Sequence, residues 1–234
     1  MCGRYVSPGD WAIEHFWHIG ARKSERWIES FNVAPTMQVP MLCLTPQGEL
    51  ELVAARWDLI PFWWTQPKPP DFSFNARSEA AATMPMWRQS LRTHRCLMLA
   101  LGWYEWNKHQ QVRGRSGYKT NQPYYHHGID NGVLAIAGLW STWFGPEGQK
   151  VVSCAMLTRD AAPSVAFVHH RMPVILPAEQ FDLWLSPSTP IKQVEDAVAL
   201  SREDFFAYPV STEVNNIRND SSKLLKPVEI VPMA

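Results

Sequence analysis

The chain has 234 residues, of which 46% are hydrophobic, and its formal net charge at pH 7 is zero. This length allows one large or two small domains with a real core, and the hydrophobic fraction excludes a disordered chain. A neutral total argues against a strongly basic DNA-coating protein, and no apolar run reaches the length of a bilayer span.

The first residues and the cysteines indicate the cellular compartment. Arg4 and Asp10 interrupt any apolar leader, so we expect a cytoplasmic protein, associated with the nucleoid if prokaryotic, and no membrane partner. The cysteines form no CxxC pair, which excludes zinc ribbons and thioredoxin-like motifs. Cys43, Cys96 and Cys154 lie in strand-like apolar runs, and we expect them to be buried and inert.

The N-terminal elements follow from capping and alternation signals. Ser7, Pro8 and Asp10 form a helix-start signature with Ser7 as the N-cap. Residues 37–44 and 50–56 are then predicted to be two strands joined by a turn.

The remaining elements predict an α+β fold. In chain order they are a proline-rich loop over 59–72, a helix over 76–91 broken near Pro85, a strand over 95–106 that turns at Gly102, a loop over 107–121, strands at 122–127, 133–139 and 150–157, and helices at 177–185 and from Ser201. Strands dominate without a βαβ rhythm, which favours a curled, mostly antiparallel sheet.

Charged residues are unevenly distributed along the chain. Residues 88–119 are mainly basic and residues 179–213 mainly acidic. A neutral protein can therefore carry one basic face, although an ordinary solvated surface also explains the pattern.

Cys2 directly follows Met1, and this position has a chemical consequence. Removal of Met1 would leave an α-amine and a thiol on adjacent carbons. Such a 1,2-aminothiol attacks an aldehyde through its amine, and the thiol then closes a five-membered thiazolidine. Alternatively the thiolate attacks an amide, or Cys2 stands there by chance.

Three further segments carry side chains suited to catalysis or to binding anions. In FNARSE, Asn75 could bond a sugar or base and Arg77 could bind a phosphate. Alternatively, Asn75 could cap a helix and Arg77 could form a local ion pair with Glu79. In GWYEW, Glu105 lies between aromatic residues, which desolvate a carboxyl group and suit it to acid–base work, unless it points to solvent. His169 titrates near neutrality and could move protons, or be structural.

Two adjacent tryptophans, Trp63 and Trp64, lie in the proline-rich loop. Exposed aromatic rings beside cations form stacking platforms for unpaired bases, whereas buried rings would form a hydrophobic plug. The histidine pairs are adjacent and alternate in direction along a strand, so we expect no metal site and no cofactor.

Taken together, these segments resemble the SRAP (SOS-response-associated peptidase) family. The motifs are MCGRY, FNVAP, W-x-L-I-P-x-W-W, FNARSE, GWYEW, HHRMPVIL and VSTEVNNIRND, and they extend over nearly the whole chain. The resemblance implies a single compact domain over residues 1–234 with a barrel-like β core. It also implies a monomer that crosslinks abasic sites in single-stranded DNA through its mature N-terminal cysteine, removes its own initiator Met and has a weak lyase activity.

The resemblance also implies roles for individual residues. Catalytic roles fall on Cys2, Asn75, Glu105 and His169, and DNA-binding roles fall on Arg4, Pro35, Trp63, Trp64, Arg77, Arg88 and Thr158. The aromatic pair would lie at a junction between single-stranded and double-stranded DNA.

The chain departs from the family pattern at two positions. His170 stands where an aspartate is common, and Pro85 stands where a basic residue is common, so that Arg88 could replace that phosphate contact. Two rival functions remain at this point: an N-terminal-nucleophile amidohydrolase using Cys2, and a non-catalytic single-strand binder.

Overall fold

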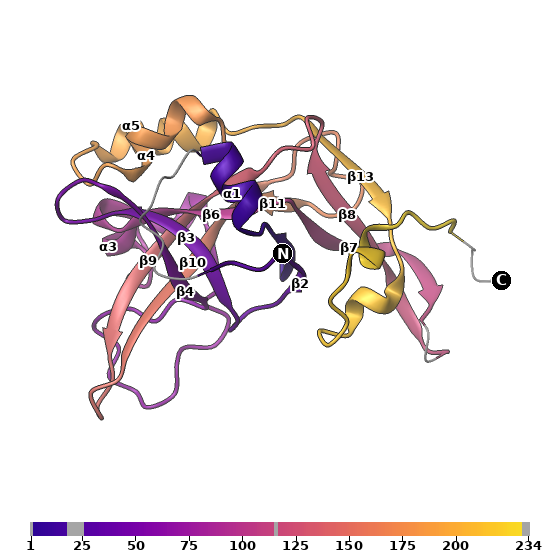
Figure 1. Cartoon of the computed structure of the whole chain (residues 1–234), viewed down its shortest axis with the longest axis horizontal. Helices are drawn as coiled ribbons and strands as arrows, with labels where there is room; N and C mark the ends of the chain where they lie inside the picture. Colours follow the sequence, from indigo (N-terminus) through magenta and orange to yellow (C-terminus); the bar gives the residue numbers. More distant parts are fainter. Residues whose placement is uncertain (1, 18–25, 115–116, 231–234) are drawn as a thin grey trace.

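The computed structural model describes residues 2–17, 26–114 and 117–230. Two sheets dominate it, and several short helices flank them (Figure 1). Met1 and the end of the first predicted helix lie outside the described residues. In the described ranges, no helix is both long enough and apolar enough to cross a bilayer.

The first sheet closes into a five-stranded barrel. Its strands are β3 (Gln38–Leu44), β4 (Leu50–Trp57), β6 (Arg95–Ala100), β9 (Leu134–Phe144) and β10 (Lys150–Asp160). Antiparallel pairs join β4 to β3, β3 to β6, β6 to β9 and β9 to β10, and a parallel pair between β10 and β4 closes the ring. A closed ring leaves no free strand edge among these five strands.

The second sheet is antiparallel and lies beside the barrel (Figure 1). Its order is β13 (Phe205–Pro209), β8 (Lys119–Gly128), β7 (Gly102–Arg113), β1 (Arg4–Ser7) and β2 (Ser30–Val33). The chain passes from the barrel strand β6 directly into β7, so the N-terminal strand β1 is held next to the strand that carries Glu105.

Three short strands extend the barrel where β10 ends. They are β5 (Asn75–Arg77), β11 (Arg171–Pro173) and β12 (Ile175–Leu176). β5 pairs in parallel with β10 and β11 pairs antiparallel with it, while β12 pairs with β9. The segments around Asn75 and His169 are therefore brought to the same end of one strand.

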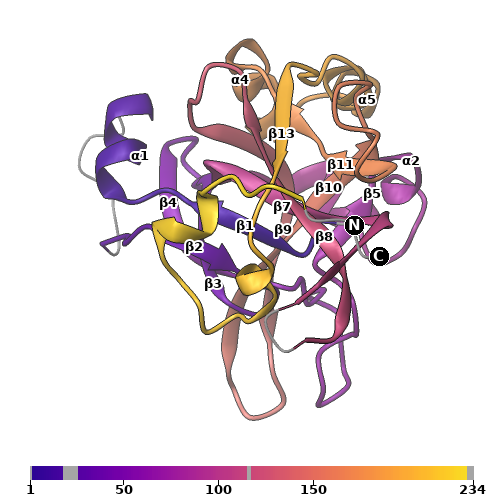
Figure 2. The same cartoon turned by 90° about the vertical axis from the view of Figure 1, so that its right-hand side faces the viewer.

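Short helices cover the barrel, and α4 and α5 lie at the top of both cartoon views (Figures 1 and 2). The α-helices are α1 (Asp10–Trp17), α2 (Ser78–Ala81), α3 (Arg88–Thr93), α4 (Phe181–Leu185) and α5 (Ile191–Ala199), and the 3₁₀ turns are η1 (Ala178–Gln180), η2 (Thr212–Asn215) and η3 (Ser222–Leu225).

Alternate residues of the barrel strands separate into two buried clusters. One contains Leu97 and joins the helices through Trp184 of α4. The other contains Met98 and joins the second sheet through Cys2 and Tyr5. This period of two follows from the alternation of side chains along a strand, and it places Cys2 inside a packed core.

The strand predictions are largely confirmed. The strand that turns at Gly102 is divided there into β6 and β7, and a Cβ atom at Gly102 would lie 2.3 Å from the His126 carbonyl oxygen. The loop over 59–72 and the break near Pro85 are also present. Cys43, Cys96 and Cys154 are buried, as expected.

Four predictions are wrong, each because tertiary pairing overrides a local signal. The helix predicted over 76–91 starts only at Ser78, because Asn75–Arg77 pair with β10 as β5. Ser7 does not cap the first helix, since it pairs with Ser30 in the sheet and α1 begins at Asp10. Residues 107–113 and 119–121 belong to strands rather than to the predicted loop over 107–121, because polar residues there pair across the β7–β8 hairpin. Ser201 starts no helix, since α5 has already ended and the chain enters β13.

Candidate active site

Cys2 lies immediately before β1, at the junction of the two sheets, and is completely buried. Its Sγ donates a hydrogen bond to the Arg4 carbonyl oxygen at 3.5 Å. Burial raises the pKa of the Cys2 thiol well above its ordinary value. The thiol is therefore neutral in the resting protein, and a nearby group has to take its proton when the sulfur reacts.

Asn75 holds the backbone of Cys2 in place. As the first residue of β5, it is buried, and its Nδ2 donates to the Cys2 carbonyl oxygen at 2.6 Å. Its Oδ1 is also buried and has no hydrogen-bond partner among the described residues. An unsatisfied buried acceptor is costly, so Oδ1 is suited to receive a donor from a ligand or from the amine of Cys2.

Glu105 is the fourth residue of β7 and is only 3% exposed. Desolvation raises the pKa of its carboxyl group to about 7. A group with this pKa exchanges protons readily near neutral pH, as a general acid–base catalyst must. Its Oε1 lies 3.9 Å from Nδ1 of His169.

His169 precedes β11 and is held in its neutral form. Its Nδ1 lies 3.0 Å from the backbone nitrogen of Arg171 and 3.2 Å from the Arg171 carbonyl oxygen. In the tautomer with the proton on Nε2, Nδ1 accepts from the Arg171 N–H. Desolvation lowers the pKa of His169 to about 4. His170, the departure from the family pattern, is exposed and stacks on His169 with ring centroids 4.4 Å apart.

The structure therefore brings Cys2, Asn75, Glu105 and His169 together from four separate segments of the chain. Sequence reasoning missed the residues that support them. Asn107 donates from Nδ2 to the Phe167 carbonyl oxygen at 3.2 Å, and Tyr124 packs edge-on against the Phe167 ring.

The Asn107 contact ties the segment before His169 to β7. Asn107 follows Glu105 by two residues and so shares its face of the strand, a signal that the sequence already contained.

Sequence reasoning also missed Arg171, which takes the place of Arg77 as the ion-pair partner of Glu79. Glu79 pairs with Arg171 rather than with Arg77, through two contacts of 2.6 and 2.9 Å. Arg171 also donates to the carboxylate of Asp160 and to the Thr158 carbonyl oxygen. This guanidinium bridges across β10 and joins the segments that carry Asn75 and His169.

The predicted aromatic platform forms one wall of a surface cavity. Trp63 is 43% exposed, and its ring centroid lies 6.0 Å from that of Trp64, whose Nε1 donates to the Lys68 carbonyl oxygen. Trp63, Phe62 and Arg88 share a cavity of about 340 Å³. The structure thus places Arg88 beside the tryptophan loop.

The other predicted DNA-binding residues lie in different environments. Arg77 is exposed at the end of β5, directly after the Asn75 segment. Thr158 is its register partner in β10 but is fully buried, with Oγ1 3.4 Å from the Ala76 carbonyl oxygen. Only Arg77 of this pair therefore presents its side chain to solvent.

Arg4 is the first residue of β1, and Pro35 follows the end of β2 that pairs with the start of β1. Nη1 of Arg4 donates to Asn32 Oδ1 at 3.2 Å and to the Val214 carbonyl oxygen at 2.8 Å, so this nitrogen is engaged inside the protein. Pro35 is half-buried in the turn after β2. The predicted basic stretch over 88–119 is not one face, because Arg95 is buried among helix C-terminal carbonyls and Arg115 lies outside the described residues.

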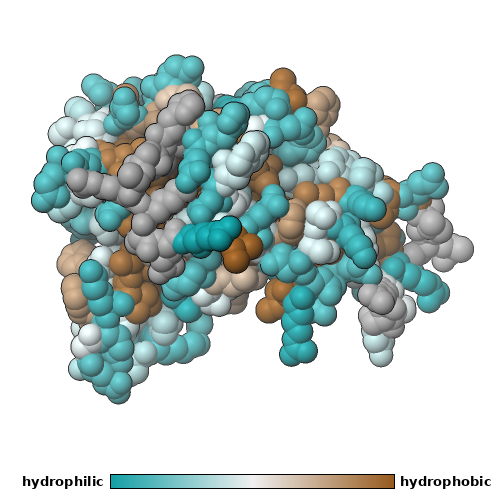
Figure 3. Space-filling model, in the orientation of Figure 1, coloured by the Kyte–Doolittle hydropathy of each residue, from teal (hydrophilic) through white to brown (hydrophobic). Residues whose placement is uncertain are grey.

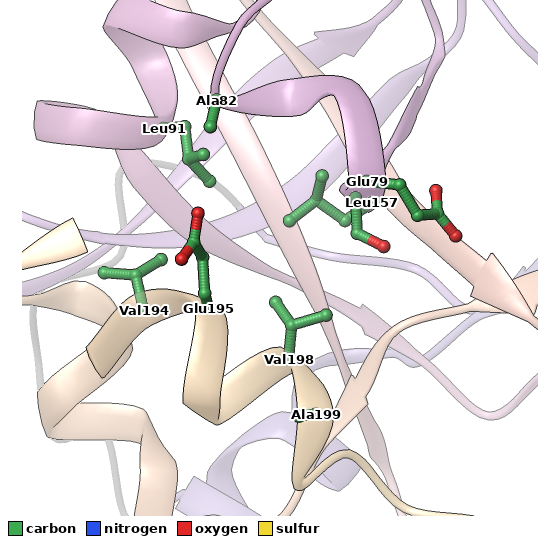
Figure 4. A pocket seen from close by; sticks show the side chains of 9 residues that line it. Glu79, Ala82, Leu91, Leu157, Val194, Glu195, Val198 and Ala199 are labelled. Carbon is green, nitrogen blue, oxygen red and sulfur yellow. The ribbon is translucent and has the colours of Figure 1, made fainter. Parts of the chain in front are cut away.

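A separate apolar cavity of about 270 Å³ lies between α2, α5 and β10 (Figure 4). Leu157, Val194 and Val198 line it together with Glu79 and Glu195. None of the predicted site residues lines it. Over the described ranges, no group of three or more histidine, cysteine or acidic side chains is arranged to hold a metal ion.

Comparison with known proteins gives a family and a fold. The chain matches the family described as SOS response associated peptidase (SRAP) over residues 1–217. It is 30% identical over 230 residues to the abasic site processing protein YoqW of Bacillus subtilis, covering 97% of this chain and 99% of that protein. It is 28% identical to the abasic site processing protein HMCES of Gallus gallus, covering 90% and 71%.

Solved structures agree with the α+β fold. A protein from Bordetella bronchiseptica superposes with a TM-score of 0.73 at 25% identity, covering 90% of this chain and 100% of that one. A phage-related protein from the same organism superposes with a TM-score of 0.66 at 28% identity, covering 89% and 94%.

Proposed function

Because the chain belongs to the SRAP family, we propose that it processes abasic sites in single-stranded DNA by forming a covalent bond through Cys2. The observation that carries this proposal is the convergence of Cys2, Asn75, Glu105 and His169 on one buried site. Two relatives with high coverage are named as abasic site processing proteins, which supports the same substrate.

The chemistry needs the α-amine of Cys2, so Met1 must first be removed by hydrolysis of the bond between them. The amine nitrogen then attacks C1′ of the ring-opened sugar and forms a carbinolamine. Loss of one water gives an imine, and addition of Sγ to the imine carbon closes a thiazolidine. The thiol proton passes to the nitrogen, so the net reaction is aldehyde plus aminothiol giving thiazolidine plus water.

Glu105 is the proton carrier in this scheme. Its pKa of about 7 means that both forms are populated near neutral pH, whereas His169 is neutral there. During ring opening the protonated carboxyl donates to the sugar ring oxygen and recovers the proton that the C1′ hydroxyl loses as the aldehyde forms. It then donates to the departing hydroxyl of the carbinolamine. The carboxylate then accepts the thiol proton, and Nε2–H of His169 donates a hydrogen bond to the sugar.

This division of labour modifies the expectation that His169 itself moves the protons. A neutral imidazole whose Nδ1 is occupied by the Arg171 N–H is a weak acid. If ring closure by the thiol is blocked, the imine persists and permits β-elimination, which would give a weak lyase activity. The same site would serve the removal of Met1.

DNA would be held beside this site by side chains at the surface. Arg77 adjoins Asn75 and would bind a phosphate, and Arg88 lies beside Trp63 where a duplex end would stack. The protein would act as a monomer and as one domain, at junctions between single-stranded and double-stranded DNA in the cytoplasm or the nucleoid.

A denaturing gel tests the proposal directly. Protein shown by mass spectrometry to lack Met1 is mixed with a labelled single strand that carries one abasic site, and with an intact strand. We expect a heat-stable shifted band only with the abasic strand. The matched controls are Cys2→Ala, which should bind the strand without forming the band, and Cys43→Ala, which should crosslink as the wild type does.

The alternatives give different results. If the abasic strand is never captured by protein that lacks Met1, the proposal is wrong, and glutamine or peptide hydrolysis would point to an N-terminal-nucleophile amidohydrolase. Salt-sensitive binding that is equal for intact and abasic strands, without a covalent product, would indicate a non-catalytic single-strand binder.

A further inference from the structure

A second surface cavity, of about 280 Å³, lies at the other end of the tryptophan loop. It is bounded by the turn after β2, by the end of β4 and by the last residues of the 59–72 loop. Its walls include Pro35, Thr36, Arg56, Asp58, Phe72 and Phe74. None of the catalytic side chains lines it, so it is distinct from the Cys2 site.

Two residues of this cavity have an unusual backbone. Thr36 has φ of 77° and Phe72 has φ of 58°, in the left-handed region that favours glycine. Met37 N–H donates to the Ala34 carbonyl oxygen, so Thr36 takes the third position of a tight turn that normally requires glycine. The backbones of two residues that line one cavity are thus strained, and backbone strain of this kind is commonly retained at ligand-binding sites.

Phe72 is also unusually exposed. Its side chain is 83% accessible, although burial of a phenylalanine is strongly favourable. Hydrophilic residues dominate the face of the molecule in Figure 3, where hydrophobic residues form several separate patches. An exposed ring on a strained loop beside a cavity is available to stack on a flat, apolar ligand.

The polar side of the cavity is formed by Arg56 and Asp58. Nη2 of Arg56 lies 3.3 Å from Asp58 Oδ2, and Nη1 lies 3.5 Å from the Thr36 carbonyl oxygen. Both contacts are long for charged groups, and the buried Nε has no hydrogen-bond partner in the described part of the chain. Asp58 is fixed by Ser73, whose Oγ donates to it at 2.8 Å.

The cavity shares a wall with the Cys2 site. Phe74 lines the cavity, and the next residue is Asn75, which binds the Cys2 carbonyl oxygen. Trp57 donates from Nε1 to the Phe74 carbonyl oxygen and packs edge-on against both Phe74 and Tyr5 in the cluster that contains Cys2. The cavity and the Cys2 site are therefore joined through two consecutive residues, Phe74 and Asn75.

We propose that the cavity holds the unpaired base of a nucleotide that neighbours the abasic site in the same strand. The base stacks on Phe72, and Arg56 donates to its edge. Because guanine presents two acceptors, O6 and N7, to an arginine fork, guanine is bound better than adenine or a pyrimidine. The inference rests on the proposed function for the path of the strand, and it gives the protein a preference for sequence context.

The test measures capture and binding for strands that differ only beside the abasic site. Each neighbouring position carries in turn guanine, adenine, thymine or a reduced baseless residue that cannot crosslink. At one position we expect guanine to lower the apparent Kd about tenfold relative to the baseless residue, equivalent to about 1.4 kcal/mol. Fluorescence anisotropy gives the Kd, and the denaturing gel gives the capture rate.

Three variants assign the effect to this cavity. Phe72→Ala should abolish the tenfold difference, and Phe72→Tyr, which keeps the ring, should retain it. Arg56→Gln should remove the preference for guanine over adenine but keep the gain over the baseless residue. Phe144→Ala is the matched control, since Phe144 is another exposed phenylalanine, at the far end of β9.

The outcomes separate this inference from the proposed function. If abasic strands are captured without any preference at a neighbouring position, or if Phe72→Ala discriminates as the wild type does, the base site is wrong and the proposed function stands. If no strand is captured, the proposed function fails. The Kd values from the anisotropy series on the same strands then still test the base site. A preference in the wild type that is lost in Phe72→Ala supports the base site, whereas a wild type without any preference overturns it.

Discussion

At the scale of single residues, the decisive feature is a carboxyl group in an apolar environment. The aromatic neighbours of Glu105 in the sequence predict desolvation, and the structure confirms a raised pKa of about 7. Burial disfavours the charged form, so the same feature that prepares Glu105 for proton transfer makes its ionised state unfavourable for folding.

Replacing Glu105 should therefore stabilise the protein in a pH-dependent way. The folded pKa exceeds the ordinary value of 4.5. Below pH 4.5 the carboxyl group is protonated in both the folded and the unfolded state, and its burial lowers the free energy of unfolding least. As pH rises from 4.5 to about 7, only the unfolded state releases its proton, so the free energy of unfolding declines. Above about 7 the decline is complete. We expect Glu105→Gln to raise the free energy of unfolding by about 3 kcal/mol at pH 8, with little change at pH 4.5.

Urea denaturation at the two pH values measures this difference. Glu51→Gln, at a more exposed carboxyl on β4, is the control and should show no such pH dependence. Equal stabilities of Glu105→Gln and the wild type at pH 8 would contradict the assignment of a buried, protonatable carboxyl.

The rate of capture should also depend on the protonation of Glu105. A free Cys2 amine, with an ordinary pKa of about 7.7–8.0, favours high pH, and a protonated Glu105, with a pKa of about 7, favours low pH. We expect a bell-shaped profile with a maximum between the two values. In Glu105→Gln the rate should fall about 100-fold and the descending limb should disappear; a bell that survives in this variant would remove Glu105 from the proton transfer.

At the scale of elements, two short strands place the catalytic side chains. β5 and β11 both pair with the end of β10, and the ion pair between Glu79 and Arg171 joins them. The hydrogen bond from Arg171 lowers the pKa of Glu79, which shows that the ionised carboxylate is the stabilised form. The ion pair between Glu79 and Arg171 therefore helps to position Asn75 and His169, although neither of these two residues takes part in it.

Loss of this ion pair should impair positioning more than DNA binding. We expect Glu79→Gln to lower the capture rate about tenfold while the Kd for the intact strand changes less than twofold. Glu195→Gln is a matched control, because Glu195 faces the same cavity from α5 (Figure 4). An equal loss of binding and rate, or an equal effect of both variants, would show that Glu79 acts through charge alone.

Asn32 holds the segment after β13 in place through hydrogen bonds. Its Nδ2 donates to the carbonyl oxygens of Val214, Asn216 and Asn219, and its Oδ1 accepts from Arg4. One buried amide thus fixes the segment after β13 against β2.

Asn32→Ala should release this segment, because several buried carbonyl groups lose their donor. We expect the free energy of unfolding to fall by about 1–3 kcal/mol. Hydrogen exchange over residues 212–220 should accelerate in the variant. Asn121→Ala, in the β7–β8 hairpin, is the control, and unchanged exchange over 212–220 in Asn32→Ala would contradict the role of the amide.

At the scale of the whole molecule, a neutral protein must bind a polyanion through local charge. The chain has a net charge of zero, so long-range attraction contributes little and individual arginines decide the salt dependence. Arg77 and Arg88 are both exposed, Arg77 at the end of β5 and Arg88 beside Trp63.

Single-strand binding should therefore show a shallow salt dependence. Each phosphate contact contributes about −0.7 to the slope of log K against log salt concentration. We expect Arg77→Ala and Arg88→Ala each to reduce the magnitude of the slope by about 0.7, and Lys192→Ala, on α5, to leave it unchanged. An unchanged slope in either arginine variant would exclude that residue from phosphate binding.

The sequence by itself determined the fold class, most strands and the candidate residues. Short apolar runs indicate β3, β6 and β10, because both faces of these strands are buried. Motif order placed Cys2 and Glu105 among the candidates, and the family is confirmed over residues 1–217. These features depend on neighbours along the chain, so local pattern suffices for them.

Tertiary structure alone decided how the segments meet. The closing pair of β4 with β10, the extension of β7 through polar residues, and the pairing of Glu79 with Arg171 join residues far apart in sequence. It also decided that His169 is neutral and Cys2 fully buried. Burial and charge pairing depend on what packs against a side chain in space, and no local pattern along the chain specifies that partner.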